Sequence, residues 1–249
     1  MAKTSGLGDN LYISGFDASG DISALSNVGG GPAPLDFTAI TKSAMERQGG
    51  VRDGRLEFTA FFNHVQAGTG THEVLSALPT TDRVITYCRG TSLGDPAACL
   101  VAKQINYDGN RNQDGSFTFG VSAQANSYGL QWGQQLTAGL RTDTGATLGT
   151  SIDTAASAAF GAQAFLHVTA FSGTDVTVKI QDSADNSTFA DVTGLTFTQV
   201  TAGPTSERLA TGSTATIRRY LRAVTVTTGG VTSVTFNVTV IKNDTAVTF

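Results

Sequence analysis

Hydrophobic and polar residues alternate in the C-terminal part of the chain with the period of two that a half-buried β-strand produces. In Asp175–Gln181 and in most of Val231–Ile241, every second residue is valine, isoleucine or phenylalanine and the residues between are polar. Turn-forming residues separate such segments: Ser172-Gly173, Asp185-Asn186-Ser187, Gly203-Pro204 and Gly229-Gly230. This pattern, continued over about 90 residues, predicts a β-sandwich of the jelly-roll or immunoglobulin-like kind.

The N-terminal part is also predicted to consist mostly of strands. These are Leu11–Phe16, Leu35–Ile40, Arg55–Phe62, Val84–Arg89, Leu100–Tyr107 and Ser116–Ala125. Two short helices are expected, at Thr41–Gln48 before a Gly-Gly stop and at Thr71–Leu78 before Pro79. Arg52-Asp53-Gly54 and Asp108–Gly115 are expected to be loops. The predicted fold class is therefore all-β with one or two short helices.

A change in composition divides the chain. Thr142–Gly161 is rich in small and polar residues and has no clear period, as a linker or domain edge should be. Up to Asp153 there are 10 Lys/Arg and 14 Asp/Glu, whereas from Thr154 onward there are 6 of each sign. We therefore expect two domains, residues 1–155 and residues 156–249.

Composition narrows the range of functions. Only 14% of the residues are charged, against about 25% in a typical globular chain. The net charge of −4 argues against attraction to nucleic acid or anionic membrane through bulk electrostatics. The longest apolar run, Ala97–Ala102, is too short to span a bilayer, and MAKTSGLGDN lacks the apolar stretch of a signal peptide. We expect a chain made in the cytoplasm, with Cys88 and Cys99 reduced and buried.

One motif could indicate hydrolysis. Gly90-Thr91-Ser92-Leu93-Gly94 matches the G-x-S-x-G elbow of α/β-hydrolases, in which a strand and a helix flank an exposed serine. The strand–helix alternation of that fold is missing, and His167 is the only histidine later in the chain. A chance match is expected in a chain with 29 glycines.

Two sets of residues could hold a metal ion. Asp108, Asn110, Asn112 and Asp114 alternate like the first ligands of a calcium loop, but the glycine and glutamate that should follow are absent, which favours a polar hairpin loop. A zinc site would have to combine His64, His72, Cys88 and Cys99, whose spacing resembles no zinc motif.

The remaining candidate is a basic cluster, Arg218, Arg219 and Arg222 around Tyr220. It is either a patch for a polyanionic glycan or phosphate, or a strand edge neutralised by Asp182, Asp185 or Asp191, and we favour the second. No acid, base and nucleophile occur in a defensible constellation, which favours a structural or binding protein over an enzyme. The sequence assigns no catalytic, cofactor-binding or metal-binding residue, and it does not locate an oligomer interface.

Three stretches, taken in order, resemble a known family. They are LYISGFDASGDISAL, PLDFTAITKSAMERQGGVRDGRLEFTAFFN and HEVLSALPTTDRVITYCRG. The order resembles the tail tube (major tail) proteins of long-tailed bacteriophages over roughly residues 8–140. The most distinctive part is the expected helix Thr41–Gln48, Gly-Val-Arg-Asp-Gly and the strand ending Phe61-Phe62-Asn63. The later stretches VTVKIQDSADNSTFADVTG and RRYLRAVTV resemble an outward β-sandwich appended to some tube and capsid proteins.

The resemblance implies a structural virion protein without cofactor or catalytic site. Six copies would form a ring, and stacked rings would form a tail tube that conducts double-stranded DNA into the host. Its partners would be tape-measure, tail-tip and tail-terminator proteins, and DNA would pass the lumen without tight binding. The alternatives are a capsid decoration or fibre-base protein that binds a surface through the C-terminal sandwich, and a carbohydrate-binding module with exposed aromatic residues there.

Overall fold

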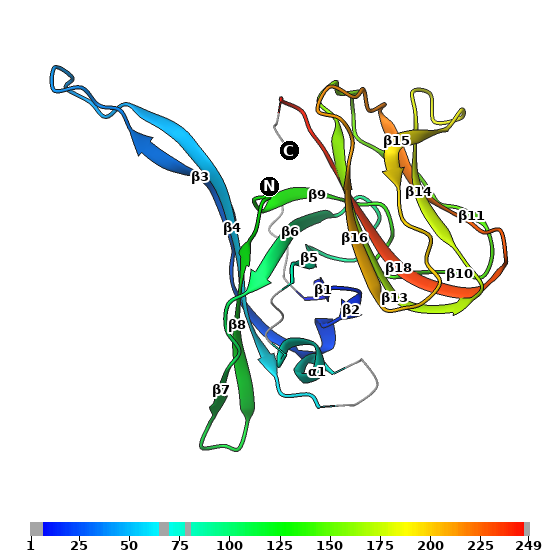
Figure 1. The fold of residues 1–249 in the computed structure, drawn as a ribbon, viewed down its shortest axis with the longest axis horizontal. Coiled ribbons are helices and arrows are strands. Elements are labelled where there is room, and N and C mark those ends of the chain that lie inside the picture. Colours follow the sequence, from blue (N-terminus) through cyan, green and yellow to red (C-terminus); the bar gives the residue numbers. More distant parts are fainter. Residues whose placement is uncertain (1–6, 65–69, 78–80, 247–249) are drawn as a thin grey trace.

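The computed structural model describes residues 7–64, 70–77 and 81–246 (Figure 1). The chain is nearly all β, as predicted, with one short α-helix, α1 (Thr71–Leu75), and one 3-10 turn at Ser19–Asp21 among these residues. The strands are β1 (Asn10–Ile13), β2 (Phe16–Asp17), β3 (Ile22–Asp36), β4 (Arg47–Phe61), β5 (Arg83–Cys88), β6 (Pro96–Gln104), β7 (Asp108–Arg111), β8 (Phe117–Ala125), β9 (Gln131–Gln135), β10 (Arg141–Asp143), β11 (Thr147–Leu148), β12 (Ile152–Asp153), β13 (Ala162–Gly173), β14 (Thr177–Ser183), β15 (Ala190–Thr196), β16 (Thr205–Ala210), β17 (Tyr220–Val226) and β18 (Val231–Lys242). No helix in the described ranges is long and apolar enough to cross a membrane.

The N-terminal strands curl around one core. Hydrogen bonds connect them in the order β2-β1-β5-β6-β8-β4-β3, and all these pairs are antiparallel. In β4, Leu56, Phe58 and Ala60 point inward and are buried, because alternate residues of a strand face the same side. Leu75 brings α1 into the same cluster. The helix at residue 71 is confirmed and ends at Leu75, and its predicted last residue, Leu78, lies outside the described residues.

The C-terminal strands form a sandwich. One layer is β16-β13-β18, and the other is β14 with β15 and β17. Leu166 of β13 and Phe236 of β18 share a buried cluster with Ile180 of β14 and Leu221 of β17, so the two layers face each other across this core. The alternation that predicts β14 and β18 from the sequence thus corresponds to one buried face.

The two halves share a sheet. β18 pairs with β13 along one edge and, near its C-terminal end, with β9, through Thr239↔Gln135 and Val240↔Gln134. Because β9 also pairs with β6, the larger sheet has 13 strands and continues from one half into the other. Leu136 and Ile152, which precede residue 155, lie in the core of the C-terminal sandwich. Whether the chain divides into two folding units near residue 155 remains a prediction.

A buried histidine also joins the halves. The Nδ1 atom of His167, on β13, accepts a hydrogen bond from the backbone N–H of Gly15 at 3.2 Å. Nε2 therefore carries the proton, and it donates to Thr86 Oγ1 on β5 at 2.9 Å. Burial lowers the pKa of His167 to about 3, so the ring is neutral at physiological pH.

The helix predicted at Thr41–Gln48 is wrong. Residues 37–46 form a non-helical connection, and β4 already begins at Arg47, where the backbone pairs Leu35↔Gln48 and Asp36↔Arg47 form. An eight-residue helix is marginal without tertiary packing. Met45 is exposed, and Ile40 is fully exposed, so no packed face stabilises a helix there.

Of two expected loops, one is strand throughout and the other begins as a strand. Arg52-Asp53-Gly54 lies inside β4, where Gly31 pairs with Asp53. The expected loop Asp108–Gly115 begins with the short strand β7, so only its second part is a turn between β7 and β8. The free, buried state of Cys88 and Cys99 is confirmed.

The close approach of β9 and β18 at the junction between the halves requires glycine at position 133. A Cβ atom at Gly133 would lie 2.3 Å from the carbonyl oxygen of Val240. We expect Gly133→Ala to lower the free energy of unfolding by about 1–3 kcal/mol, because β9 and β18 must move apart. The matched control is Gly145→Ala, where a Cβ meets no atom within 4 Å. Urea denaturation measures both, and equal stability of the two variants would contradict the close approach.

His167 predicts a pH dependence of stability. The unfolded chain takes up a proton on His167 below its ordinary pKa of 6.5, whereas the folded chain does not until about pH 3. The contribution of His167 to the free energy of unfolding is complete above pH 6.5. Below pH 6.5 this contribution is lost, by up to about 1.4 kcal/mol for each unit by which the pH falls. We expect His167→Gln to have a flatter profile between pH 6.5 and about 5, above the range in which carboxylates titrate. Parallel profiles in urea denaturation would contradict this account.

Candidate assembly surface

A long β-hairpin leaves the body of the protein. β3 and β4 pair from Ile22↔Ala60 out to Asp36↔Arg47, but β8 pairs with β4 only from Arg55 to Phe61. Beyond that point the hairpin has only two strands, and Figure 1 shows it projecting away from both halves. We call residues 29–53 the arm and residues 36–47 its tip.

Two glycines allow close packing at the point where the arm leaves the body. A Cβ atom at Gly54 would lie 2.3 Å from the backbone nitrogen of Leu130, and one at Gly30 would lie 2.5 Å from the carbonyl oxygen of Asp53. Side chains at these positions would therefore collide with backbone. The root of the arm is thus held against Leu130, and Asp53 beside it accepts a hydrogen bond from Gln124 of β8 at 3.1 Å.

The arm carries apolar side chains that nothing in the described structure covers. Ile40 is fully exposed, Val51 is 85% exposed, and Phe37 and Met45 are 60% and 58% exposed. Leu35 is also exposed. A two-stranded ribbon is at best marginally stable in water, and exposed apolar patches mark interaction sites. The arm is therefore a candidate assembly surface.

The free edge of the arm limits uncontrolled pairing. Among the described strands, β3 pairs only with β4, so its other edge is open over 15 residues. Pro32 and Pro34 each remove one N–H donor from β3, and the register shifts between them. Such irregularities are typical of edge strands that must avoid aggregation.

Polar contacts fix the shape of the tip. Asp36 Oδ1 accepts the N–H of Thr38 at 2.9 Å, and Thr38 Oγ1 accepts the N–H of Glu46 at 2.9 Å. Lys42 and Glu46 form an exposed ion pair at 2.8 Å. The tip therefore has a defined turn, although it does not contact the body.

The G-x-S-x-G motif does not form a nucleophile elbow. Gly90–Gly94 is the turn between β5 and β6, so the serine lies between two strands rather than between a strand and a helix. The N–H of Ser92 donates to Asp95 Oδ2 at 2.8 Å. His167 bonds to Thr86 and Gly15 instead.

The candidate metal ligands have other partners or lie apart. In the β7–β8 turn, Asn112 donates to Ser116 Oγ, and Asp114 accepts the N–H and hydroxyl of Ser116. The Nδ1 atom of His72 forms a hydrogen bond with Tyr107 Oη. Cys88 lies in a separate buried cluster with Tyr12 and Ala97. Within the described ranges, no three His, Cys, Asp or Glu residues form a metal-binding group.

The basic cluster is largely neutralised, as the favoured interpretation predicts. Arg218 pairs with Asp182 at 2.8 Å, which is one of the expected partners. Arg219 instead binds Asp153 through two hydrogen bonds of 2.6 Å, and this arginine lowers the pKa of Asp153 to about 2. Arg222 donates to Gln181 Oε1 and lies 3.9 Å from the centre of the Phe189 ring.

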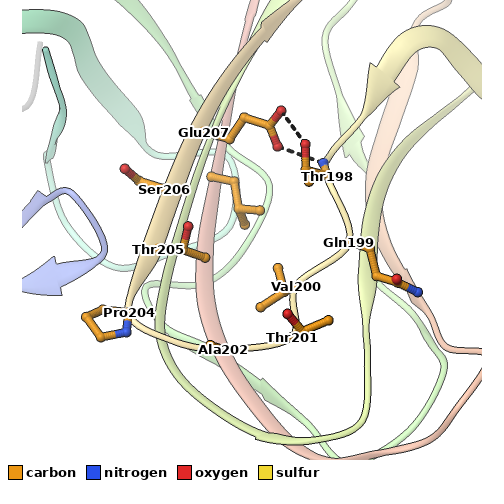
Figure 2. A pocket seen from close by; sticks show the side chains of 10 residues that line it. Thr198, Gln199, Val200, Thr201, Ala202, Pro204, Thr205, Ser206 and Glu207 are labelled. Carbon is orange, nitrogen blue, oxygen red and sulfur yellow. Dashed lines mark hydrogen bonds between the residues drawn. The ribbon is translucent and has the colours of Figure 1, made fainter.

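The hollow beside β16 does not resemble a glycan-binding site. The hollow has a volume of about 460 Å³. Figure 2 shows Thr198, Val200, Thr201, Pro204 and Glu207 among the side chains that line it. The carboxylate of Glu207 already accepts the N–H and hydroxyl of Thr198, at 2.7 and 3.0 Å. No aromatic side chain lines the cavity. The aromatic residues that the sequence places in this sandwich are buried or half-buried, except that Phe249 lies outside the described residues.

Comparison with known proteins gives only distant structural similarity. No protein family and no curated protein matches the chain. The crystal structure of the phage SPP1 Dit (gp 19.1) protein, described as a hub adsorption apparatus, is 10% identical with a TM-score of 0.34 and covers 94% of this chain and 99% of its own. The phage p2 baseplate in its activated conformation with Sr is 9% identical with a TM-score of 0.37, covering 95% and 99%. Both structures come from phages, and similarity at this level assigns no function to the chain.

The exposed arm predicts where proteases cut first. Lys42, Arg47 and Arg52 are exposed on a ribbon that can open without unfolding the body. We expect trypsin to cleave dilute protein first after one of these residues, leaving both halves folded. Mass spectrometry of early fragments identifies the site, with the chain carrying Gln at all three positions as the control. A first cut after Lys179 or Arg222 would show that the arm is not the least stable part.

Proposed function

We propose that this chain is a structural subunit of a bacteriophage tail that assembles with copies of itself through the arm. The single observation that carries the proposal is a projecting two-stranded ribbon whose apolar residues Phe37, Ile40 and Val51 are exposed in the single chain. A ribbon of this kind becomes stable when another subunit covers it. The resemblance of residues 8–140 to tail tube proteins supports a phage tail as the assembly.

More specifically, we propose that the chain is the subunit of a tail tube. Six copies form a ring, stacked rings enclose a channel, and double-stranded DNA passes through it during ejection into the host. The subunit would contact tape-measure, tail-tip and tail-terminator proteins in the virion tail. We propose no enzymatic role and no cofactor.

The charge of the chain supports passage of DNA without tight binding. The excess of four negative charges lies within residues 1–153, most of which belong to the part that resembles a tube wall. Protein–DNA affinity comes mainly from lysine and arginine contacts to phosphates, and like charges repel. The basic cluster does not provide a free phosphate site, because Arg218 and Arg219 are paired with carboxylates.

Electron microscopy of concentrated full-length protein tests the proposal. We expect rings or hollow unbranched tubes, formed either by the chain alone or only after tail-tip or tape-measure partners are added. Ile40→Asp places a charge at the tip and should abolish assembly while leaving the melting temperature unchanged, because Ile40 touches nothing in the single chain.

Leu148→Asp is the matched control, since Leu148 is exposed on β11 of the C-terminal sandwich, away from the arm. It should assemble like the unaltered chain. Protein that stays monomeric with the partners present, yet binds phage heads, would contradict the proposal and favour a decoration protein. Normal assembly of Ile40→Asp would exclude the arm as the assembling element.

A further inference from the structure

A hollow of about 380 Å³ lies at the root of the arm, where three parts of the chain meet. Its wall includes residues of the arm, of the turn between β8 and β9, and of the strands β9 and β13: Val51, Arg52, Tyr128, Gln131 and Gln163. The arm, the N-terminal half and the C-terminal half therefore all contribute to it. Ligand sites often form in such a place between structural units.

Arg208 of β16 lies beside this hollow and is held by two residues of its wall. Its Nε and Nη2 atoms donate to Gln163 Oε1 at 3.1 and 2.5 Å, and its guanidinium carbon lies 3.5 Å from the centre of the Tyr128 ring. Burial lowers the pKa of Arg208, as expected for a charge that is partly removed from water. Among the described residues, Arg208 forms no ion pair with a carboxylate. A half-buried positive charge thus lacks a counterion.

The two amide side chains beside Arg208 have their acceptor atoms occupied. An arginine only donates, so Gln163 must present its carbonyl oxygen to Arg208 and donate through Nε2 to Gln131 Oε1. Gln163 is only 1% exposed, and these contacts fix its orientation. The NH2 group of Gln131 is then the end of the network at the wall of the hollow. The network therefore offers donors to a ligand, and a ligand that accepts hydrogen bonds would complete it.

A second arginine lines the hollow from the arm. A Cβ atom at Gly129 would lie 3.1 Å from the Cβ of Arg52, so the Arg52 side chain starts against the turn between β8 and β9. The adjacent Asp53 forms no ion pair with it, and adjacent side chains of a strand point to opposite faces. The carboxylate of Asp53 instead accepts from Gln124 Nε2 at 3.1 Å and from the N–H of Gly54 at 2.7 Å.

We infer that this hollow binds a phosphate group, either as the free ion or as an ester. Arg52 and Gln131 line the hollow and can donate to the phosphate oxygens, and Arg208 adds a positive charge beside the wall. Two arginines without carboxylate partners match a phosphate, which carries about −1.5 to −2 charges at pH 7, better than a carboxylate with one charge. Asp244, near the C-terminal side of the hollow, is exposed and forms no ion pair in the described ranges.

A phosphate in this hollow would connect the root of the arm to both halves. Arg52 belongs to the arm, Gln131 to the N-terminal half and Arg208 to the C-terminal half. The site is complete within one chain, so the inference goes beyond the proposed function and does not depend on assembly. A single site of this kind is compatible with passage of DNA without tight binding, because that affinity is the sum of many phosphate contacts.

Isothermal titration of the full chain with inorganic phosphate, at constant ionic strength, tests the inference. We expect one site per chain with a Kd on the order of 1 mM or tighter, which two or three charge-assisted hydrogen bonds can provide. Arg52→Gln should weaken binding about tenfold, the loss expected for one such bond, without changing the melting temperature. Arg208→Gln should weaken it similarly, and Arg208→Lys, which keeps the charge, should retain more of it. If Arg208→Gln fails to fold, Arg52→Gln still decides the matter.

The matched control is Arg47→Gln, which removes the same charge from the same arm but at its tip. It should bind phosphate like the unaltered chain. Phenyl phosphate separates the two forms of the ligand: tighter binding than that of inorganic phosphate indicates an ester, and weaker binding indicates the free ion. The inference is overturned if phosphate shows no saturation at about ten times the expected Kd. Equal weakening by Arg52→Gln and Arg47→Gln, or acetate binding as tightly as phosphate, would also overturn it.

Discussion

The pairing of β4 with β8 is the constraint on which the rest of the structure depends. β4 is one continuous strand, but only its second part, from Arg55 to Phe61, has strands on both sides. There Leu56, Phe58 and Ala60 are buried and hold the strand in the N-terminal core. The first part continues in the same direction with β3 as its only partner. The body therefore fixes the direction in which the arm points.

Strand pairing and hydrogen bonds join the C-terminal half to the N-terminal half. β18 carries the sheet across the junction by pairing with β9, and Gly133 leaves room for the Val240 carbonyl. His167 adds two hydrogen bonds from β13 to the N-terminal half without introducing a charge, since burial keeps it neutral. The composition boundary at Thr142–Gly161 thus coincides with strands β10, β11 and β12, which pair with β17 and β18, rather than with a free linker.

The sequence pattern predicts correctly those strands that have one buried face. Asp175–Gln181 and Val231–Ile241 alternate because their inward residues fill the sandwich core, and the all-β class follows from such segments. The arm could not be predicted in this way, because both of its faces are exposed and no alternation is required. Thr41–Gln48 has the composition of a helix, but a helix also needs a packed face, which the tip lacks. The glycines and prolines around the arm were the available signal, since they are typical of a ribbon edge. The partner of Arg219 was missed because Asp153 comes from β12, a strand that the linker-like composition concealed.

The central claim is that the arm is exposed in the single chain and covered in an assembly of identical subunits. Hydrogen–deuterium exchange of residues 29–53, in dilute protein and in assembled protein, measures this directly. The account predicts rapid exchange in the dilute state, because the ribbon opens independently of the body, and strong protection after assembly. Amides of β13 and β18, buried in both states, should exchange slowly throughout. Equal exchange of the arm before and after assembly would contradict the account.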